Sequence, residues 1–512
     1  MKGRFNTSDF LYPTGLALLA LLVFMYIFNP KIDINGDNCY YYAFATALAA
    51  GEGYVDIACE PSALFPPGYP LLMTPLRFIT DSIVAQKVMN LLFLFSATLL
   101  LYYTLLRVEV KRSLAFIACA AVLVTPHLLE FSTMMMSEAS CIFFISLSIW
   151  SYVKIDETIS ATGTMPWRNV WLWVFVLSVA YAFFIRTQAV VLLAAFLGAL
   201  LFARRFKLAI LLLLVFVLCW LPWALRNSAL ELGQSRYVSQ IDFSNVMDNL
   251  VMLTVQAIPE SIIPFMPVKY ALSPSLFLYV AALVMLVLIV YGFFKMKCLR
   301  VLLPLFLVGN IAIVSIMNTP SFYRYMVIVL PFITAGIVVG LWNALSLASM
   351  RWLKCSVNPW FMLLLFLPLF ATAEDKTKHT MRGLHEVARE GYPPSLKTFV
   401  AIGKEVAKLP DAKIVASRKP ELLFVHAGVR GKRLQEKTTE VDIINHMLDE
   451  NIDYVVLENM GVRYTYEVLY PFIQHRQDLF KLVKYTSDPM SILFKFKKNE
   501  ALQWVKSRGY RE

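Results

Sequence analysis

Apolar residues occur in long blocks through the first three quarters of the chain, separated by short polar segments. Because about 20 mostly apolar residues cross the hydrocarbon core of a membrane as a helix, these blocks predict eleven spans. The predicted spans are 11–28, 83–106, 114–131, 137–153, 170–185, 187–203, 208–225, 276–294, 301–317, 325–347 and 358–373. The segments 170–185 and 187–203 are short and meet at Arg186, so a re-entrant pair of helices is the alternative to two full spans there.

The pattern changes after residue 373, where helical periodicity alternates with stretches rich in Val, Ile, Leu and Phe. The predicted helices are 396–409 and 439–451, and the predicted strands are 413–416, 453–457 and 491–496. Such an alternation is typical of a small layered α/β structure. We therefore expect a transmembrane domain at 1–373, with a first outside loop at 29–82, and a soluble, extracytoplasmic α/β domain at 374–512.

Composition supports this division and excludes an ordinary soluble enzyme. Of the 512 residues, 58% are hydrophobic and 16% are charged, and the mean hydropathy is +0.62. Residues 1–373 hold 23 Lys and Arg and 16 Asp and Glu, whereas the shorter segment 374–512 holds 24 and 19. In that second segment we interpret Arg430, Lys432 and Arg433 as a solvated face.

The net charge of +12 is mainly a topology signal. Lys and Arg of short loops stay on the cytoplasmic side, and here they fall in alternate loops. The groups expected there are Lys2/Arg4, Arg107/Lys111/Arg112, Lys154/Arg168, Arg204/Arg205/Lys207, Lys295/Lys297/Arg300 and Arg351/Lys354. This pattern predicts a multi-pass protein of the cytoplasmic (inner) membrane, with its N-terminus in the cytoplasm, and we expect no nucleic-acid partner.

The first outside loop concentrates acidic residues beside the membrane. They are Asp33, Asp37, Glu52, Asp56, Glu60 and Asp81. A predicted helix at 40–50 follows Asp37, so this carboxylate is either an N-cap or a functional group. The loop also holds Cys39 and Cys59, which either form a disulfide in an oxidising compartment or remain shielded free thiols.

Further polar residues fall at the predicted outside ends of the spans. They are His127, Glu130, Glu138, Arg186, Arg226, Asn227, Tyr323, Arg324 and Tyr325, with Lys87 just inside the second span. A single Arg at such a boundary is often only an anchor whose head reaches the water. Several guanidinium groups facing one compartment, with acids between them, predict a site for an anionic headgroup.

The order of these residues resembles that of the polytopic GT-C glycosyltransferases. The matching segments are Asp37…Tyr41/Tyr42, 51–54 (Gly-Glu-Gly-Tyr), 65–70 (Phe-Pro-Pro-Gly-Tyr-Pro), Ser137-Glu138, Arg186, Pro222-Trp223…Arg226-Asn227 and Arg324-Tyr325. The most similar branch is that of the bacterial relatives of protein O-mannosyltransferases and of the aminoarabinose transferase that modifies lipid A. The resemblance covers the membrane region and extends more loosely to residues 415–420 and 452–456.

The resemblance implies roles for individual residues. It makes Asp37 the catalytic base and Glu138 a second acidic position in catalysis. The cations that it places near the donor phosphate are Arg324, Arg226, Lys87 and Arg186. The aromatic residues expected in the substrate pocket are Tyr41, Tyr42, Tyr69 and Tyr325. Many relatives have Asp-Glu where this chain has Asp37-Asn38, so whether the protein requires a divalent metal stays an open question. No other cofactor is expected.

The implied activity is transfer of a sugar from a polyprenyl-phosphate-linked donor to an acceptor at the outer face of the membrane. Phosphate is a good leaving group, so the reaction needs cations for the developing charge and one carboxylate as base. A single carboxylate without a nucleophilic partner predicts direct displacement with inversion. The sugar, hexosyl or pentosyl, and the acceptor, a glycolipid, polysaccharide or protein, remain open.

Two alternatives stand beside this interpretation. One is a polytopic transporter or lipid flippase for a lipid-linked saccharide. Such proteins place ionisable groups near the bilayer midplane and often contain internal repeats, whereas here the ionisable groups gather at one edge. The other is an inactive relative whose external domain binds a partner, for which Asn38 is the main support.

Overall fold

The computed structural model describes residues 7–34, 37–232, 240–262, 275–318, 322–352, 358–366, 380–412, 414–437 and 439–508. The chain divides into two compact units. The helical unit consists of Met1–Pro30, Ala63–Tyr69 and Ser82–Arg389, and the sheet unit consists of Lys31–Ser62, Pro70–Asp81 and Glu390–Glu512. Most of the first outside loop therefore belongs to the same unit as the C-terminal sheet. The predicted boundary between residues 373 and 374 lies outside the described residues.

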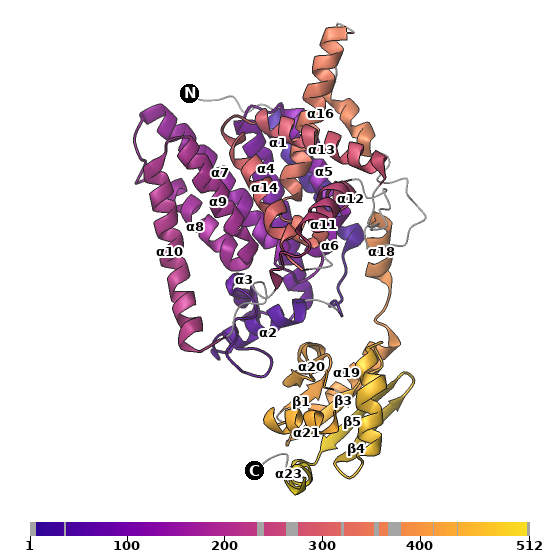
Figure 1. Cartoon of the computed structure of the whole chain (residues 1–512). Helices are drawn as coiled ribbons and strands as arrows, with labels where there is room; N and C mark the ends of the chain where they lie inside the picture. Colours follow the sequence, from indigo (N-terminus) through magenta and orange to yellow (C-terminus); the bar gives the residue numbers. More distant parts are fainter. Residues whose placement is uncertain are drawn as a thin grey trace. The chain divides into compact units, whose positions relative to one another are not determined.

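Seven helices of the described chain are long and apolar enough to cross a membrane. These spans are Phe10–Ile27, Ile83–Arg107, Glu138–Thr162, Phe206–Ala229, Leu276–Phe294, Lys297–Ser315 and Leu330–Arg351. In Figure 1 the helices that form them are α1 (Thr7–Ile27), α4 (Ile83–Arg107), α7 (Glu138–Thr162), α10 (Phe206–Ala229), α13 (Leu276–Phe294), α14 (Leu302–Ser315) and α16 (Leu330–Trp352). The chain is thus a polytopic α-helical membrane protein, as the apolar blocks predict.

The remaining predicted spans are shorter or bent. Span 114–131 is a pair of helices, α5 (Arg112–Leu123) and α6 (Pro126–Ser132), that meet at 59° where Pro126 begins the second helix. The segments around Arg186 form α8 (Val170–Ile185) and α9 (Val190–Phe202), each short of a full crossing. Only Pro359–Phe366 of the last predicted span is described, as a 3-10 helix. The exact number of eleven spans is not confirmed.

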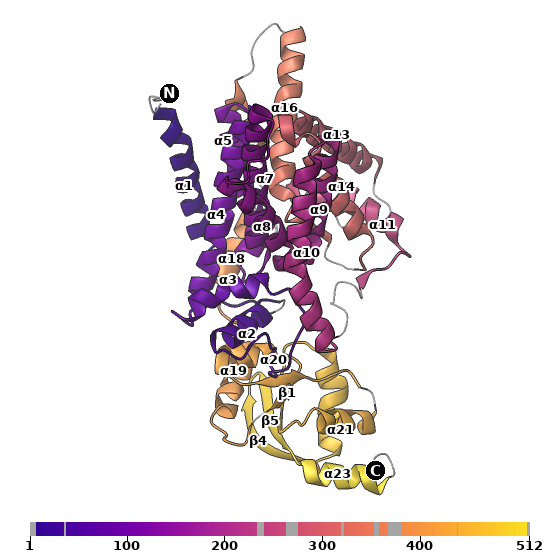
Figure 2. The same cartoon turned by 90° about the vertical axis from the view of Figure 1, so that its left-hand side faces the viewer.

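Short helices connect the spans of the helical unit. They are α3 (Gly68–Arg77), which passes into the sheet unit, α11 (Val246–Val251), α12 (Ile258–Ile262), α15 (Phe322–Met326) and α18 (Met381–Arg389). Helix α7 packs against α4 and α8, and α10 packs against α8 and α9, as the rotated view in Figure 2 also shows. Glycines permit the closest approach, between α13 and α16, where a Cβ on Gly292 would lie 1.9 Å from the Gly336 carbonyl oxygen.

The C-terminal part of the sheet unit is a five-stranded sheet in the order β2-β1-β3-β5-β4. The strands are β1 (Val415–Ser417), β2 (Gly431–Arg433), β3 (Tyr454–Leu457), β4 (Phe480–Ser487) and β5 (Met490–Phe496). Strand β1 pairs in parallel with β2 and β3, whereas β5 pairs antiparallel with β3 and β4. The predicted strands correspond to β1, β3 and β5; β2 and β4 carry mainly polar or exposed residues, and hydrophobic alternation misses them.

Helices cover both faces of this sheet. They are α19 (Pro394–Val406), α20 (Pro420–Ala427), α21 (Glu440–Asp449), α22 (Tyr470–His475) and α23 (Lys498–Ser507), and the first loop adds α2 (Asn38–Ala49). Helices α21, α22 and α23 share one hydrophobic core with Val455 and Leu457 of β3. Successive strand residues face opposite sides, and α19 and α20 contact the sheet at β5 and β1. The predicted α/β fold of the C-terminal segment is confirmed.

Candidate functional site

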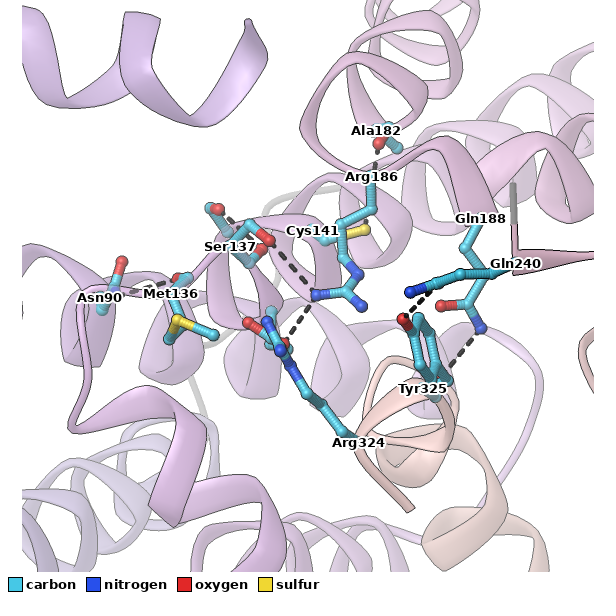
Figure 3. Close-up of polar contacts among 12 residues, drawn as sticks. Asn90, Met136, Ser137, Cys141, Ala182, Arg186, Gln188, Gln240, Arg324 and Tyr325 are labelled. Atoms are coloured by element: carbon cyan, nitrogen blue, oxygen red, sulfur yellow. Dashed lines mark hydrogen bonds and ion pairs between the residues drawn. The ribbon is translucent and has the colours of Figure 1, made fainter. Parts of the chain in front are cut away.

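A buried carboxylate and two arginines meet at one end of the helical unit. Glu138 Oε1 lies 2.6 Å from Arg186 Nη1 and accepts a hydrogen bond from Arg324 Nε at 2.9 Å. Arg186 Nη1 also donates to the Ser137 hydroxyl oxygen at 3.3 Å. Figure 3 shows the Arg186 and Arg324 side chains converging on this point from different elements. We call Glu138, Arg186 and Arg324 the charge cluster.

Helix ends bring the three side chains together. Glu138 is the first residue of α7, directly after Ser137, and Arg186 directly follows the last residue of α8. Since α7 and α8 are packed neighbours joined by a short connection, the start of one lies beside the end of the other. Arg186 has an extended backbone, with φ −144° and ψ 122°, which ends α8. Arg324 comes from the short helix α15.

The charge cluster carries one more positive charge than negative charge. The exposed fractions of the side chains are 0% for Glu138, 3% for Arg186 and 22% for Arg324. Two guanidinium groups share one oxygen of the carboxylate, and Glu138 Oε2 has no hydrogen-bond partner among the described residues. Guanidinium groups are strong hydrogen-bond donors to anions, so two of them at one point favour an anionic ligand beside them. Arg324 is the most exposed member of the charge cluster, so an anionic ligand can approach the cluster from the Arg324 side.

Uncharged polar side chains fix the surroundings of the cluster. Asn90 donates hydrogen bonds from Nδ2 to the carbonyl oxygens of Met134 (2.6 Å) and Met136 (3.0 Å), in the segment before Ser137. The Tyr69 hydroxyl donates in turn to Asn90 Oδ1 at 3.1 Å. These contacts tie the start of α7 to α4 and to the start of α3, which holds Glu138 in place.

A second polar group links Arg186 to the other side of the site. Gln188 Nε2 donates to Asn310 Oδ1 at 2.9 Å and to the Tyr325 carbonyl oxygen at 2.8 Å. The Tyr325 ring lies 5.7 Å from the Arg186 guanidinium carbon, within cation–π range. Arg324 is thus held by Glu138, and Tyr325 is held by Gln188, with the Arg186 side chain between these two contacts (Figure 3).

A cavity of about 530 Å³ adjoins the charge cluster. Its lining is mainly apolar and aromatic: Pro66, Phe183, Phe184, Thr187, Gln188, Val190, Trp220, Trp223, Ala224, Asn227, Ile241, Ile313, Ile316, Met317 and Tyr325. Thr187 and Gln188 directly follow Arg186, and Tyr325 directly follows Arg324, so the cavity lies beside both arginines. An apolar cavity next to two guanidinium groups suits a ligand with an anionic head and an apolar tail.

The other predicted cations occupy two different places. Arg226, on α10, lies 4.8 Å from the Trp223 ring and donates to Asn227 Oδ1 at 2.8 Å. Both of those neighbours line the cavity. Lys87 is 1% exposed on α4 and donates from Nζ to the Asn29 carbonyl oxygen at 2.9 Å. Their predicted contact with a donor phosphate stays a prediction.

Asp37 belongs to the sheet unit, where it stands immediately before α2. Its side chain makes no capping hydrogen bond to α2, although its carbonyl oxygen accepts from the Tyr41 N–H at 3.1 Å. The cap alternative therefore has no support in the structure. Tyr41 is buried in the same unit, and the Tyr42 ring lies 4.3 Å from the Arg77 guanidinium carbon.

Of the four tyrosines expected in a substrate pocket, Tyr325 lines the cavity. Tyr69 is fully buried on Asn90, and Tyr41 and Tyr42 lie in the sheet unit, so these three have packing contacts away from the cavity lining. Sequence reasoning missed Gln188, Asn310 and Asn90. The available signal was an amide within an apolar block, because a buried amide needs hydrogen-bond partners.

The two loop cysteines are free thiols in the structure, so the disulfide alternative between Cys39 and Cys59 is not realised. Cys39 is buried on α2, and burial raises the pKa of its thiol well above the usual value. Among the described residues, no group of three or more His, Cys, Asp or Glu side chains is placed to hold a metal ion. We therefore derive no reaction step through a metal.

Comparison of the sequence with protein-family models and with curated proteins gives no match. Solved structures are similar in fold. ArnT from Cupriavidus metallidurans, bound to undecaprenyl phosphate, superimposes with a TM-score of 0.57 at 12% identity, over 95% of this chain and 98% of that one. The oligosaccharyltransferase AglB from Archaeoglobus fulgidus, in complex with an inhibitory peptide and a dolichol-phosphate, gives 0.56 at 12% identity, over 88% and 69%. The predicted GT-C fold is confirmed.

Proposed function

We propose that this protein is a glycosyltransferase that moves a sugar from a polyprenyl-phosphate-linked donor to an acceptor at the outer face of the membrane. The observation that carries the proposal is the charge cluster of Glu138, Arg186 and Arg324 beside an apolar cavity of about 530 Å³. A polyprenyl phosphate combines an anionic head, which matches the charge cluster, with an apolar chain, which matches the cavity. The two structural neighbours contain undecaprenyl phosphate and dolichol-phosphate, ligands of this same class.

In this proposal the arginines bind the donor phosphate and stabilise the charge that develops as it leaves. Arg324 is the accessible partner, and Arg186 supplies a second guanidinium from the protein interior. Glu138 is assigned a positioning role, because its Oε1 atom already pairs with both arginines. Arg226 and Lys87 are proposed as further cations near the phosphate, and Tyr325 as a wall of the donor pocket.

Asp37 is proposed as the general base. It takes the proton from the acceptor hydroxyl as the acceptor oxygen bonds to the anomeric carbon. The bond from that carbon to the phosphate oxygen breaks on the opposite face, and the polyprenyl phosphate leaves with the electron pair. One displacement without a covalent intermediate inverts the anomeric configuration. The capping alternative has no support, since the Asp37 side chain makes no capping bond at the start of α2.

We infer residence in the cytoplasmic membrane, with the charge cluster at the outer face and a glycolipid, polysaccharide or protein as acceptor. Positive loop residues support this orientation, since Lys297 and Arg107 lie at the opposite ends of the helices from Glu138 and Arg324. The transporter or flippase alternative has no comparable support. The ionisable residues of the cluster lie at helix ends, and the structural neighbours do not favour that class.

The base assignment is tested by Asp37→Asn, with Asp33→Asn as a matched control in the same loop. Purified full-length protein is incubated with a panel of polyprenyl-phosphate sugars and an acceptor membrane extract, and donor consumption is followed. We expect Asp37→Asn to lower the transfer rate by about 10²–10⁴-fold, because general-base assistance contributes roughly that much. Donor binding should be unchanged in both variants. Full activity of Asp37→Asn would remove Asp37 from the mechanism.

A further inference from the structure

The C-terminal part of the sheet unit contacts the first outside loop on both sides of Asp37. Five residues before Asp37, the Ile32 N–H donates to the Tyr392 hydroxyl at 2.8 Å. Three residues after it, the Tyr40 ring lies 6.0 Å from the Arg433 guanidinium carbon. Residues adjoining Asp37 are thus fixed by side chains that are more than 350 positions away in the chain.

The same surface binds the loop again beyond α2. Glu52, just after the helix, pairs with Arg430 at 2.6 Å, and Glu60 pairs with Lys432 at 2.5 Å. The intervening turn is held by Asp56, whose Oδ1 accepts from the N–H groups of Ala58 (2.9 Å) and Glu60 (3.0 Å). This turn presents the Glu60 carboxylate toward Lys432.

Three of these four contacts come from one short segment, Arg430–Arg433, at strand β2. Its basic residues are in turn held from inside the domain. Arg433 Nη2 lies 3.0 Å from Oε1 of the buried Glu421, and Lys432 also pairs with Glu450. Arg430 and Arg433 remain 41% and 50% exposed, as expected of a solvated face. Arg430 and Lys432 in addition pair with the loop acids, a pairing that the sequence alone could not predict.

Helix α2 completes the contact by packing against α20. Asp37 stands directly before α2 in the chain, and Ile32, five residues before it, is bonded to Tyr392. Both α2 and Ile32 are attached to the C-terminal part of the chain by the contacts described above. The position of Asp37 thus depends on residues 390–433.

From this geometry we infer that the C-terminal domain is a positioning device for Asp37, acting through β2 and Tyr392 on the first outside loop. The inference rests on the proposed role of Asp37 as base. Arg430, Lys432, Arg433 and Tyr392 are positioning residues, since they touch the loop that carries the carboxylate. A change in this domain should therefore alter the rate of transfer without altering donor binding.

Hydrogen–deuterium exchange of the full-length protein in detergent tests the contact without any substrate. The variant Arg430→Glu/Lys432→Glu places like charges opposite Glu52 and Glu60. We expect amide exchange in peptides from 38–60 to rise at least about fivefold, because exposed ion pairs contribute up to roughly that factor and reversal adds repulsion. Arg463→Glu is the matched control, because it breaks an exposed pair with Glu467 elsewhere in the domain.

Peptides from β3, Tyr454–Leu457, report whether the domain remains folded in each variant. If they too exchange faster in the reversed variant, the milder Arg430→Gln/Lys432→Gln replaces it. Loop exchange unchanged in a folded variant would contradict the inference. Exchange restored by the swapped pair Glu52→Arg/Arg430→Glu would support it, because only a direct contact predicts such rescue.

Transfer kinetics separate this inference from the proposed function. We expect Arg430→Glu/Lys432→Glu to lower kcat about tenfold with the KM for the lipid-linked donor unchanged, and the Arg463→Glu control to match the wild type. If Asp37→Asn is inactive while the reversed variant keeps its kcat and its loop exchange, the inference alone is wrong. If Asp37→Asn is fully active, the base assignment fails, and the exchange measurement still decides whether the domain holds the loop.

Discussion

Glu138 of the helical unit and Glu458 of the sheet unit are both buried, and they are held in opposite ways. Glu138 of the helical unit is 0% exposed and contacts Arg186 at 2.6 Å and Arg324 at 2.9 Å. Glu458 of the sheet unit is 2% exposed and accepts one hydrogen bond, from the Thr465 hydroxyl at 3.3 Å. Its second oxygen has no hydrogen-bond partner among the described residues.

The two environments differ in the charge state that they favour for the buried carboxyl group. Burial without an ion pair raises the pKa of Glu458 to about 7, so this carboxyl is neutral over most of the acidic range. Glu138 instead sits between two guanidinium groups. A buried ion pair is a weak stabilising device, because desolvation offsets the attraction. Stability alone therefore does not explain the arrangement, which fits the proposed binding of an anionic ligand.

The largest expected effect comes from removing the carboxylate of the charge cluster. Glu138→Ala leaves Arg186 buried at 3% exposure without its ion pair. Breaking a buried pair in this way costs about 3–5 kcal/mol of folding stability. Thermal unfolding of the purified protein should therefore shift strongly downward. On the same helix, Glu157→Ala removes an exposed pair with Arg107 and should shift it little, within about 1 kcal/mol. Equal shifts would contradict the distinction between the two environments.

The next effect concerns Glu458 and pH. Its folded pKa of about 7 lies above the ordinary value of 4.5, so the native state binds more protons than the unfolded state between these values. The stabilisation is complete below pH 4.5 and is lost as pH rises through 7, by a total of about 3 kcal/mol. Exchange from β3 and β5 of the full-length protein, corrected for the intrinsic rise of amide exchange with pH, should thus become faster over this range. Glu458→Gln should flatten the dependence, and an unchanged slope in that variant would contradict the assignment.

The smallest effect comes from the cavity wall, where Ala224 of α10 faces the apolar space. Ala224→Trp should fill part of the cavity and weaken the binding of undecaprenyl phosphate by about tenfold, within the usual cost of overpacking. Ala229→Trp, on the same helix and outside the lining, is the matched control. Equal affinity in the two variants would show that the lipid chain lies elsewhere.

Sequence patterns predict the long elements of this fold well and its short ones poorly. Apolar blocks locate α4, α7 and α10 because bilayer thickness dictates their length. The bend between α5 and α6 and the three-residue strand β2 depend on tertiary packing, which hydrophobic periodicity does not encode.

The site shows the same limit. The resemblance identifies Glu138, Arg186 and Arg324 as polar residues on one face, and the structure brings these three into contact. Their pairing could not be predicted, because it depends on the neighbouring ends of α7 and α8 and on the placement of α15. The partners of Glu52 and Glu60 could not be predicted either. They are Arg430 and Lys432, which lie more than 370 residues away in the chain, just before and within β2.

Binding of undecaprenyl phosphate to the purified full-length protein tests the central claim most directly. The wild type is compared with Arg324→Gln, which leaves Glu138 its contact with Arg186, and with Arg300→Gln, an exposed control at the opposite ends of the helices. Losing a hydrogen bond to a charged group costs about 1.5–3 kcal/mol, so Arg324→Gln should raise the Kd at least about tenfold. Arg300→Gln should leave it unchanged. Equal affinity of all three proteins would contradict the assignment of the charge cluster to the lipid phosphate.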